Sequence, residues 1–513
     1  MKQYFKYIAI LSLGIVSCEP EFDNPVDEPG AYSNGEADFT RYVALGNSLT
    51  AGYADNALYI TGQENSYPNI LAQQLDKTQD IEEFTIPFMS DNAGGLLLGG
   101  NQITNNRLVL AAGEGGSDPS PQVYTGMQAT TEVGNVLQGP FNNMGVPGAK
   151  SYHLGFSGYG NVQNLATQSA NPYFVRFASS PNATVMEDAL AQNPTFFSLW
   201  IGNNDVLGYA TSGGTGEFQL NNLDPSTYGP NDITDPNVFG SIYSEMVQAL
   251  VANATGGVLI NIPDVASVPF FTTVPTNAIP LDAQTAGVLN QQFSAYNTQV
   301  LPGLVQAGFI TAEEAQARQI NFAEGQNYVT LQDESLTNIN QAVQGPPFNL
   351  DPQTAGLLSQ LRQATPTDLI PLTSAGFLGT TVGGNPNMIN GVSVPLGDQH
   401  VLTNAEQEMV RTATEKYNQV ISGLAQVNDL ALVDANAMLR QLAEGGIAYD
   451  GGTVTAQFAT GGAFSLDGIH LTPRGYAIVA NRMIEEINAT YNAEVPKVNV
   501  GTYSTVTLSN DVQ

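Results

Sequence analysis

Short apolar runs that end in a glycine or a small polar turn recur along this chain, with amphipathic patterns between them. Four of the runs have the length and composition of buried strands, at 41–46, 195–201, 257–262 and 430–433. Helical spacing predicts further elements over 67–75, 186–192, 238–251 and about 282–306. Strands that alternate with helices are typical of an α/β fold, in which helices cover both faces of a parallel sheet.

The last two long helices are marked by their first residues. Thr403 and Glu406 have the spacing of a capping box, and Thr472 followed by Pro473 suits an N-cap and the first helical position. Apolar residues recur on one helical face behind each start. We therefore expect one helix from about residue 404 and another from about residue 473.

Side chains with catalytic chemistry follow two of the strands and precede the last helix. Ser48 follows the first strand, Asn204 follows the second, and Asp467 and His470 lie before the last helix. Ligands of open parallel sheets bind at the carboxyl edge of the strands. Acyl transfer needs a serine, a base that contacts it and an acid that orients the base. A turn at 467–470 could let Asp467 bind one ring nitrogen of His470 while the other faces Ser48.

Four blocks of this sequence resemble those of the SGNH hydrolases, also called the GDSL family. They occur in the order that the family has: Gly46-Asn47-Ser48-Leu49, Asn143-Met144-Gly145-Val146-Pro147-Gly148, Gly202-Asn203-Asn204-Asp205 and Asp467-Gly468-Ile469-His470. Each block alone is weak, but four in order make a specific signal. Ile262-Pro263-Asp264-Val265 and the helix around Tyr417 also look like longer bacterial members.

The resemblance implies a role for each of the matching residues. Ser48 would be the nucleophile, His470 the general base and Asp467 its orienting acid. The Ser48 N–H, the Gly148 N–H and the Asn204 side chain would form the oxyanion hole, and no cofactor would be needed. One departure is Asn47, which stands where the family has aspartate. Asparagine can make the same turn as aspartate but removes a negative charge near Ser48. The change is therefore expected to affect the reactivity of the nucleophile more than its identity.

The expected fold is a flavodoxin-like, three-layer α/β SGNH hydrolase domain over residues 39–490, followed by a tail at 491–513. Ser48 and His470 are too far apart in sequence for a domain of ordinary size. Segments near 93–140 and 265–400 are therefore expected to be large insertions that build the substrate pocket or a lid.

The expected activity is hydrolysis of a carboxylic ester, either an acylated glycan or a lipid. The low charge of 265–400 and its many polar residues favour short acyl chains on a sugar, whereas Phe270, Phe271 and Phe348 could line an acyl groove. A catalytically silent surface lipoprotein that binds glycan or lipid is the alternative from another class.

The ionisable residues exclude several other functions. The chain has 15 Lys and Arg against 47 Asp and Glu, a net charge of −32, so nucleic acid is not an expected partner. One cysteine and three histidines do not supply a zinc site, and no metal is expected. Of the other histidines, His400 is expected to lie in a surface loop with Asp398, and His153 to be structural.

The N-terminus has the features of a bacterial lipoprotein signal. Lys2 and Lys6 precede an apolar run, which ends in Ile15-Val16-Ser17-Cys18 and contains the only cysteine of the chain. We expect a signal peptide at 1–17, lipidation of Cys18 and a tether at 18–38. The acidic residues behind Cys18 resemble the surface-export signal of Bacteroidetes lipoproteins. The expected location is the outer membrane, on the cell surface, with its periplasmic face or plain secretion as alternatives.

Overall fold

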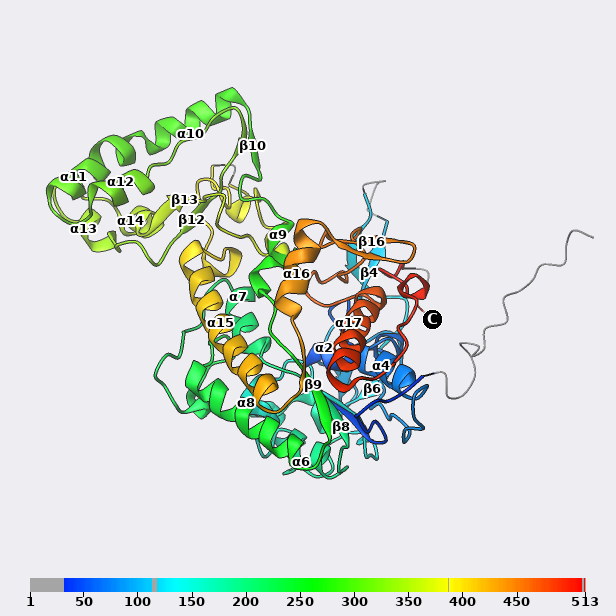
Figure 1. The fold of residues 1–513 in the computed structure, drawn as a ribbon. Helices are drawn as coiled ribbons and strands as arrows, with labels where there is room; N and C mark the ends of the chain where they lie inside the picture. Colours follow the sequence, from blue (N-terminus) through cyan, green and yellow to red (C-terminus); the bar gives the residue numbers. More distant parts are fainter. Residues whose placement is uncertain (1–31, 113–117, 386, 510–511, 513) are drawn as a thin grey trace, which may run out of the picture.

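A twisted five-stranded parallel sheet forms the centre of the molecule (Figure 1). The computed structural model describes residues 32–112, 118–385, 387–509 and 512. The strand order is β7-β1-β8-β9-β14, which is the order of flavodoxin-like folds and confirms the predicted fold class. The strands are β1 (Tyr42–Gly46), β7 (Asn143–Gly145), β8 (Phe196–Trp200), β9 (Gly256–Ile260) and β14 (Ala431–Val433).

Helices cover both faces of this sheet (Figure 1). On one face α4 (Tyr67–Leu75) packs against α17 (Pro473–Tyr491), and on the other α8 (Pro236–Val251) packs against α15 (Asn404–Val427). The two predicted caps are present, because Thr403 and Glu406 form a reciprocal capping box and the Thr472 side chain accepts from the Gly475 N–H. Shorter helices complete the layers: α2 (Ser48–Ala51), α3 (Ile60–Glu64), α5 (Pro172–Val175), α6 (Val185–Leu190), α7 (Asn204–Thr211), α9 (Pro269–Thr272) and α16 (Ala435–Glu444).

The first inserted segment forms small sheets beside the end of the chain. Its strands are β2 (Leu96–Leu98), β3 (Asn101–Gln102), β4 (Leu108–Ala111), β5 (Ser120–Val123) and β6 (Thr131–Glu132). Leu110 in β4 forms a parallel bridge with Leu508, and Arg474 in α17 binds the backbone of Tyr503 and Ser504. The tail therefore lies against α17 and β4. A further hairpin, β15 (Ile447–Tyr449) and β16 (Gly452–Val454), follows α16.

The second inserted segment has a hydrophobic core of its own, which extends from Ile279 to Val401. In Figure 1 it projects from the sheet domain as the green and yellow lobe. Its elements are β10 (Ile279–Leu281), α10 (Ala283–Ala295), α11 (Leu301–Gln306), α12 (Ala312–Ala317), β11 (Gly325–Asn327), β12 (Thr330–Gln332), α13 (Asn340–Gln344), α14 (Pro352–Leu358) and β13 (Leu361–Gln363). The helix expected over 282–306 is interrupted by a π-helical turn, Tyr296–Val300, just before Pro302, which has no N–H to continue the α pattern.

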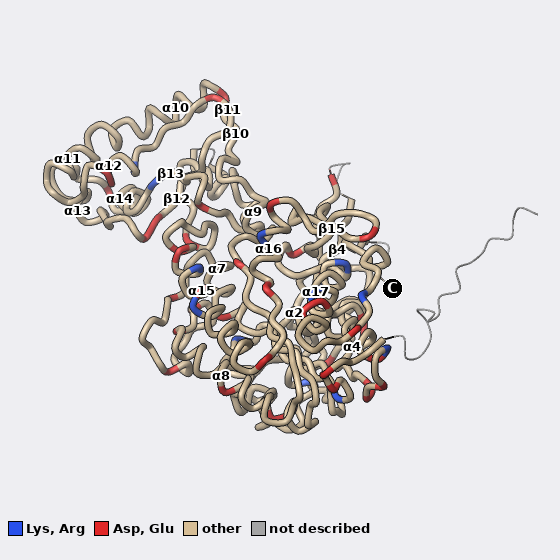
Figure 2. The backbone as a smooth tube through the Cα atoms, in the orientation of Figure 1, with Lys and Arg blue, Asp and Glu red and all other residues tan. Residues whose placement is uncertain are grey.

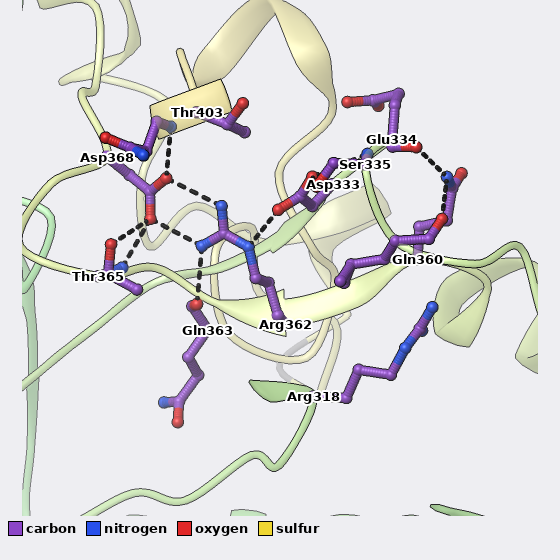
Figure 3. Close-up of polar contacts among 12 residues, drawn as sticks. Arg318, Asp333, Glu334, Ser335, Gln360, Arg362, Gln363, Thr365, Asp368 and Thr403 are labelled. Atoms are coloured by element: carbon purple, nitrogen blue, oxygen red, sulfur yellow. Dashed lines mark hydrogen bonds and ion pairs between the residues drawn. The ribbon is translucent and has the colours of Figure 1, made fainter. Parts of the chain in front are cut away.

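A buried charge network ties this lobe to the start of α15 (Figure 3). The guanidinium of Arg362 donates two hydrogen bonds to Asp368, at 2.7 and 2.8 Å, and a third to Asp333. Asp368 also accepts from the backbone N–H of Asn404, the first residue of α15. Leu369 and Leu402 exchange backbone hydrogen bonds beside it. The lobe is thus closed at its base by polar contacts.

The segment before β1 and the charged residues of the chain relate to the predicted tether, signal peptide and net charge. Predicted tether residues 32–38 are partly packed, since Glu36 and Glu494 make backbone hydrogen bonds that join this segment to the end of α17. Cys18 and the predicted signal peptide lie outside the described residues. Within the described residues, no helix has the length and apolar character to span a membrane. Acidic residues outnumber basic ones, 47 to 15, and Figure 2 shows acidic positions in both the sheet domain and the projecting lobe.

Candidate active site

Ser48 begins α2 directly after the central strand β1. Asn47 is the N-cap of this helix, and its side-chain oxygen accepts from the Leu49 N–H at 3.1 Å. Its amide nitrogen donates to the side chain of Asn203, in the loop after β8, at 3.2 Å. Aspartate could make the first contact but not donate the second. Asn47 therefore forms the expected turn and also links two of the loops that carry site residues.

The three predicted triad residues lie in hydrogen-bonding contact. The Oγ atom of Ser48 is 2.8 Å from Nε2 of His470, and Nδ1 of His470 is 2.9 Å from Oδ2 of Asp467. Ser48 is 7% exposed, and the side chain of His470 is 13% exposed. The ring of Tyr53 lies against that of His470, with centroids 4.6 Å apart. This ring contact helps to hold the imidazole of His470 between Ser48 and Asp467.

Asp467 is held as a carboxylate by several donors. Its Oδ1 accepts from the backbone N–H groups of Ile469 and His470, both at 2.8 Å, and its Oδ2 accepts from that of Asn56. Burial alone raises the pKa of Asp467, but the charge of His470 and these hydrogen bonds outweigh burial and hold the pKa well below its ordinary value. A charged Asp467 can stabilise an imidazolium on His470.

A second layer of polar contacts supports Asp467. Ser465 donates to Asp467 at 3.1 Å and accepts from the backbone N–H of Asp55. The buried Asp55 carboxylate accepts from the Leu466 N–H and pairs with Arg107 at 2.5 Å. Arg107 comes from the first insertion and stacks over the Tyr59 ring, 3.6 Å from its centroid. It also binds Thr507 in the tail, so distant segments brace the triad acid.

Gly148 lies in the loop after β7, and Asn204, at the end of the loop after β8, is the first residue of α7. The Asn204 amide donates one hydrogen bond to the Ala149 carbonyl at 2.9 Å, which joins the two loops and leaves its second N–H for another acceptor. Gly148 is exposed with a φ of +80°, and its own N–H has no acceptor within the described part of the chain. Both groups have a free N–H, as oxyanion donors require.

Asp205 has a structural role in holding these loops. Its side chain is fully buried and accepts from both the N–H and the hydroxyl of Ser151, at 2.8 and 2.6 Å. Burial raises the pKa of Asp205, while the hydrogen bonds from Ser151 oppose the shift. The last residue of the Gly202–Asp205 block therefore anchors the chain behind Gly148 instead of facing the triad.

The other two histidines lie in different surroundings. His400 contacts the Ser374 hydroxyl through Nδ1 at 3.0 Å, and its ring stacks on Phe377. Its expected pairing with Asp398 is absent from the contacts of the described residues. His153 accepts from the Lys150 N–H, and burial lowers the pKa of this imidazole to about 4. It is a neutral, structural histidine.

The second insertion reaches the triad loop through a few backbone contacts. The Phe270 N–H donates to the Gly468 carbonyl, and the Leu372 side chain lies beside Gly468. A Cβ on Gly468 would approach the Phe270 nitrogen to 2.9 Å, and its φ is +73°, so glycine is required there. Phe348 packs against Gly303 in the core of the lobe. Phe348 is half-buried there, and an acyl groove lined by Phe270, Phe271 and Phe348 stays a prediction.

One group of described residues has the donors for a cation. Glu334, Asp398 and Glu406 have carboxylate oxygens within 4.8 Å of one another at the base of the lobe. Burial raises the pKa of Glu334 to about 8 and that of Glu406 to about 7, and the neighbouring carboxyls add to both shifts. Protons bound by these acids lower the repulsion between their carboxyl groups.

Comparison with known proteins agrees with this geometry. The family model described as GDSL-like Lipase/Acylhydrolase matches residues 42–483, which include all four sequence blocks. Neither the curated proteins nor the solved structures contain a significant match to the chain. The match covers most of the chain and contains the sheet, both insertions and the Ser48–His470–Asp467 contact. The chain therefore belongs to the GDSL-like lipase/acylhydrolase family.

Proposed function

We propose that this acyl hydrolase is a serine carboxylic ester hydrolase that works through an acyl-serine intermediate. The observation that carries the proposal is the continuous contact from Ser48 Oγ through His470 to Asp467, at 2.8 and 2.9 Å. Gly148, an exposed loop glycine with a free N–H, lies beside Asn204, the first residue of α7, whose amide has a free N–H, as an oxyanion site needs.

The reaction follows from these positions. His470 takes the hydroxyl proton of Ser48 as the serine oxygen forms a bond to the ester carbonyl carbon. The carbonyl electrons move to oxygen, where the Ser48, Gly148 and Asn204 donors bind the negative charge. The tetrahedral intermediate collapses, the carbon–oxygen bond to the alcohol breaks, and His470 returns its proton to that alcohol. Water then repeats the sequence on the acyl-serine and releases the acid.

Two assays on the same preparation test this proposal. A fluorophosphonate probe should label the wild type on Ser48, and Ser48→Ala should not be labelled. A series of p-nitrophenyl esters from C2 to C16 should be hydrolysed by the wild type alone. A folded wild type that neither takes the label nor cleaves any ester would refute the enzyme and support a silent binding lipoprotein.

We also propose that Cys18 anchors the protein in the outer membrane, with the catalytic domain at the cell surface, where it acts on ester-linked acyl groups of glycans or lipids. The sequence around Cys18 carries this proposal. Cys18→Ala should move the protein from the membrane fraction to the soluble fraction and stop incorporation of labelled palmitate. Protease added to intact cells should digest the wild type. Complete protection would place it on the periplasmic face.

A further inference from the structure

Lys150 is a buried lysine that the proposed mechanism does not use. It is 4% exposed, and no other lysine of the described residues is buried. Its Nζ atom donates to the backbone carbonyl of Asp232 at 2.7 Å and lies 3.5 Å from the backbone carbonyl of Gly229. Within the described residues, both of its acceptors are carbonyl oxygens and neither is a carboxylate. Burying an ammonium group without a directly paired carboxylate costs free energy, so this lysine is expected to serve a specific purpose.

Lys150 belongs to the segment that contacts both loop donors of the oxyanion site. Gly148, whose N–H is free, lies two residues before it. The carbonyl of Ala149 accepts from the Asn204 amide at 2.9 Å. The N–H of the same peptide group, which belongs to Lys150, donates to Nδ1 of His153 at 3.0 Å. The orientation of this one peptide group therefore sets the direction of the Asn204 amide and the position of the neighbouring Gly148.

The ammonium end of Lys150 is bound to the loop that leads into α8. Asp232 in this loop is 8% exposed, and its carboxylate accepts from the backbone N–H groups of Glu217 at 3.0 Å and Gly229 at 2.7 Å. These hydrogen bonds fix the two carbonyls that Lys150 contacts. The Lys150 side chain thus connects a rigid loop with the segment that follows β7.

We propose that Lys150 is a positioning residue of the oxyanion site. Its ammonium group holds the segment from Gly148 to Ser151 in place, so that the Gly148 N–H and the Asn204 amide are directed at one oxygen. The inference rests on the proposed ester hydrolase function and assigns a role to a residue outside the four sequence blocks. Lys150 does not touch the ester and acts only through these two donors.

Other contacts keep the segment folded when the ammonium group is removed. The N–H and hydroxyl of Ser151 bind the buried Asp205, and the ring of Tyr152 packs against that of Tyr228, with centroids 5.8 Å apart. Loss of the Lys150 ammonium should therefore shift the segment without unfolding it. A misplacement of about 1 Å can lower turnover about 100-fold, so a small shift is enough to affect catalysis.

The first experiment separates transition-state binding from substrate binding. Lys150→Met should lower kcat about 100-fold on the p-nitrophenyl ester that the wild type cleaves fastest, with KM within about threefold of wild type. An alkyl trifluoromethyl ketone adds to Ser48 and forms an oxyanion, so its affinity should fall by the same factor as kcat/KM. The corresponding methyl ketone, which binds without forming this oxyanion, should bind Lys150→Met and wild type equally.

The second experiment uses a matched buried cation far from the site. Arg318 is fully buried in the second insertion, and its guanidinium donates to the carbonyls of Thr337 and Ser359. Arg318→Met should lose stability in urea unfolding, as Lys150→Met does. In folded protein, however, its kcat and its affinity for the trifluoromethyl ketone should remain those of the wild type.

The outcomes separate the role of Lys150 from the hydrolase function. A folded Lys150→Met with wild-type kcat, or an equal loss of affinity for both ketones, would overturn the positioning role and leave the hydrolase intact. If Lys150→Met does not fold, Lys150→Gln decides, because its amide can still donate to one carbonyl. It should lower kcat and trifluoromethyl ketone affinity in parallel, by about tenfold, and no change would overturn the role. A wild type that neither cleaves esters nor takes the fluorophosphonate label would contradict the hydrolase, and the role of Lys150 with it.

Discussion

The sheet domain and the second insertion each contain a serine bonded to a histidine and a buried arginine paired with carboxylates. In the sheet domain, His470 contacts Ser48 through Nε2 and Asp467 through Nδ1. In the insertion, His400 uses Nδ1 for Ser374, stacks on Phe377, and has no carboxylate on its ring among the described contacts. Burial lowers the pKa of His400, which favours its neutral form without a partner to stabilise the charged one.

In the proposed mechanism, the orienting acid is what distinguishes the Ser48–His470 pair from the Ser374–His400 pair. A base must hold the proton of the serine during the reaction, and a carboxylate on the far ring nitrogen makes the resulting imidazolium less costly. Without it, a serine–histidine contact is an ordinary buried hydrogen bond. The two buried arginines also support different parts of the molecule. Arg107 pairs with Asp55 and so supports the loop that carries Asp467, whereas Arg362 pairs with Asp368 at the base of the lobe.

The largest expected effect separates the two serine–histidine pairs. Ser48→Ala and His470→Ala should each lower turnover of p-nitrophenyl hexanoate by about 10³–10⁶-fold. Ser374→Ala and His400→Ala should remain within about tenfold of wild type, because their contact lacks an acid. Steady-state kinetics with fluorophosphonate labelling measures both. An inactive His400→Ala beside an active, folded His470→Ala would reverse the assignment.

The next effect tests the acid itself. Asp467→Asn should reduce kcat by about 10⁴-fold, since the amide cannot hold His470 in the productive tautomer or stabilise its charge. The double variant Asp467→Asn, His470→Ala should be little worse than His470→Ala alone, because the residues act as a unit. Asp398→Asn, near His400 in the sequence, is the matched control, and its kcat should stay near that of wild type.

A smaller effect compares the two buried arginines. Removing one partner of a buried ion pair costs about 3–5 kcal/mol of unfolding free energy, so Arg107→Met and Arg362→Met should both be less stable. Only Arg107→Met should also lower kcat, by about 10–100-fold with KM nearly unchanged, because displacement of the acid loop misplaces His470. Denaturant unfolding and kinetics on folded protein measure the two effects. Equal kcat values for the two variants would show that Arg107 only stabilises the fold.

The smallest effect concerns the junction between the two regions, where Glu334 and Asp398 of the insertion meet Glu406 of α15. The pKa values of Glu334, about 8, and Glu406, about 7, are raised above the ordinary value. Groups with raised pKa values contribute stability below their unfolded pKa and lose it as the pH rises through the folded pKa. The unfolding free energy should therefore fall between about pH 4.5 and pH 8.

Urea unfolding at several pH values tests this sign. Glu406→Gln should flatten the decline, and Glu334→Gln should do so further because it carries the larger shift. Glu187→Gln is the matched control, because Glu187 has the same position in the capping box of α6 as Glu406 has in that of α15. It should not alter the pH dependence of the unfolding free energy. A slope that is identical in all three variants would mean that the junction does not couple to proton binding.

The sheet domain was the more predictable of the two regions. Its buried strands are continuous apolar runs, and its last helices begin with recognisable caps, so their positions agree with expectation to within a few residues. Strand β7 was missed because its three residues, Asn143–Gly145, contain no apolar run. Helix α16 was also missed, although Asp434 as N-cap and the spacing of Leu439 and Leu442 carried a signal.

The supports of the site could not be found from local sequence. Arg107 pairs with Asp55, 52 positions away, and with Thr507, 400 positions away, and no periodicity marks such contacts. The triad could be inferred because its members lie in short blocks with fixed spacing. An apolar pocket lined by side chains of α2, β8, β14, β15, α16 and α17 likewise appears only in the fold.

The separation of Ser48 and His470 also affects how the enzyme is made. They lie 422 positions apart, at opposite ends of the catalytic domain. At roughly 5–20 residues per second, a ribosome synthesises His470 about 20–80 s after Ser48. The hydrogen bond from Arg107 to Thr507 forms later still, because Thr507 lies close to the end of the chain. In the proposed mechanism, a nascent chain lacks its general base until His470 has been synthesised, so it should not hydrolyse esters during almost all of its synthesis.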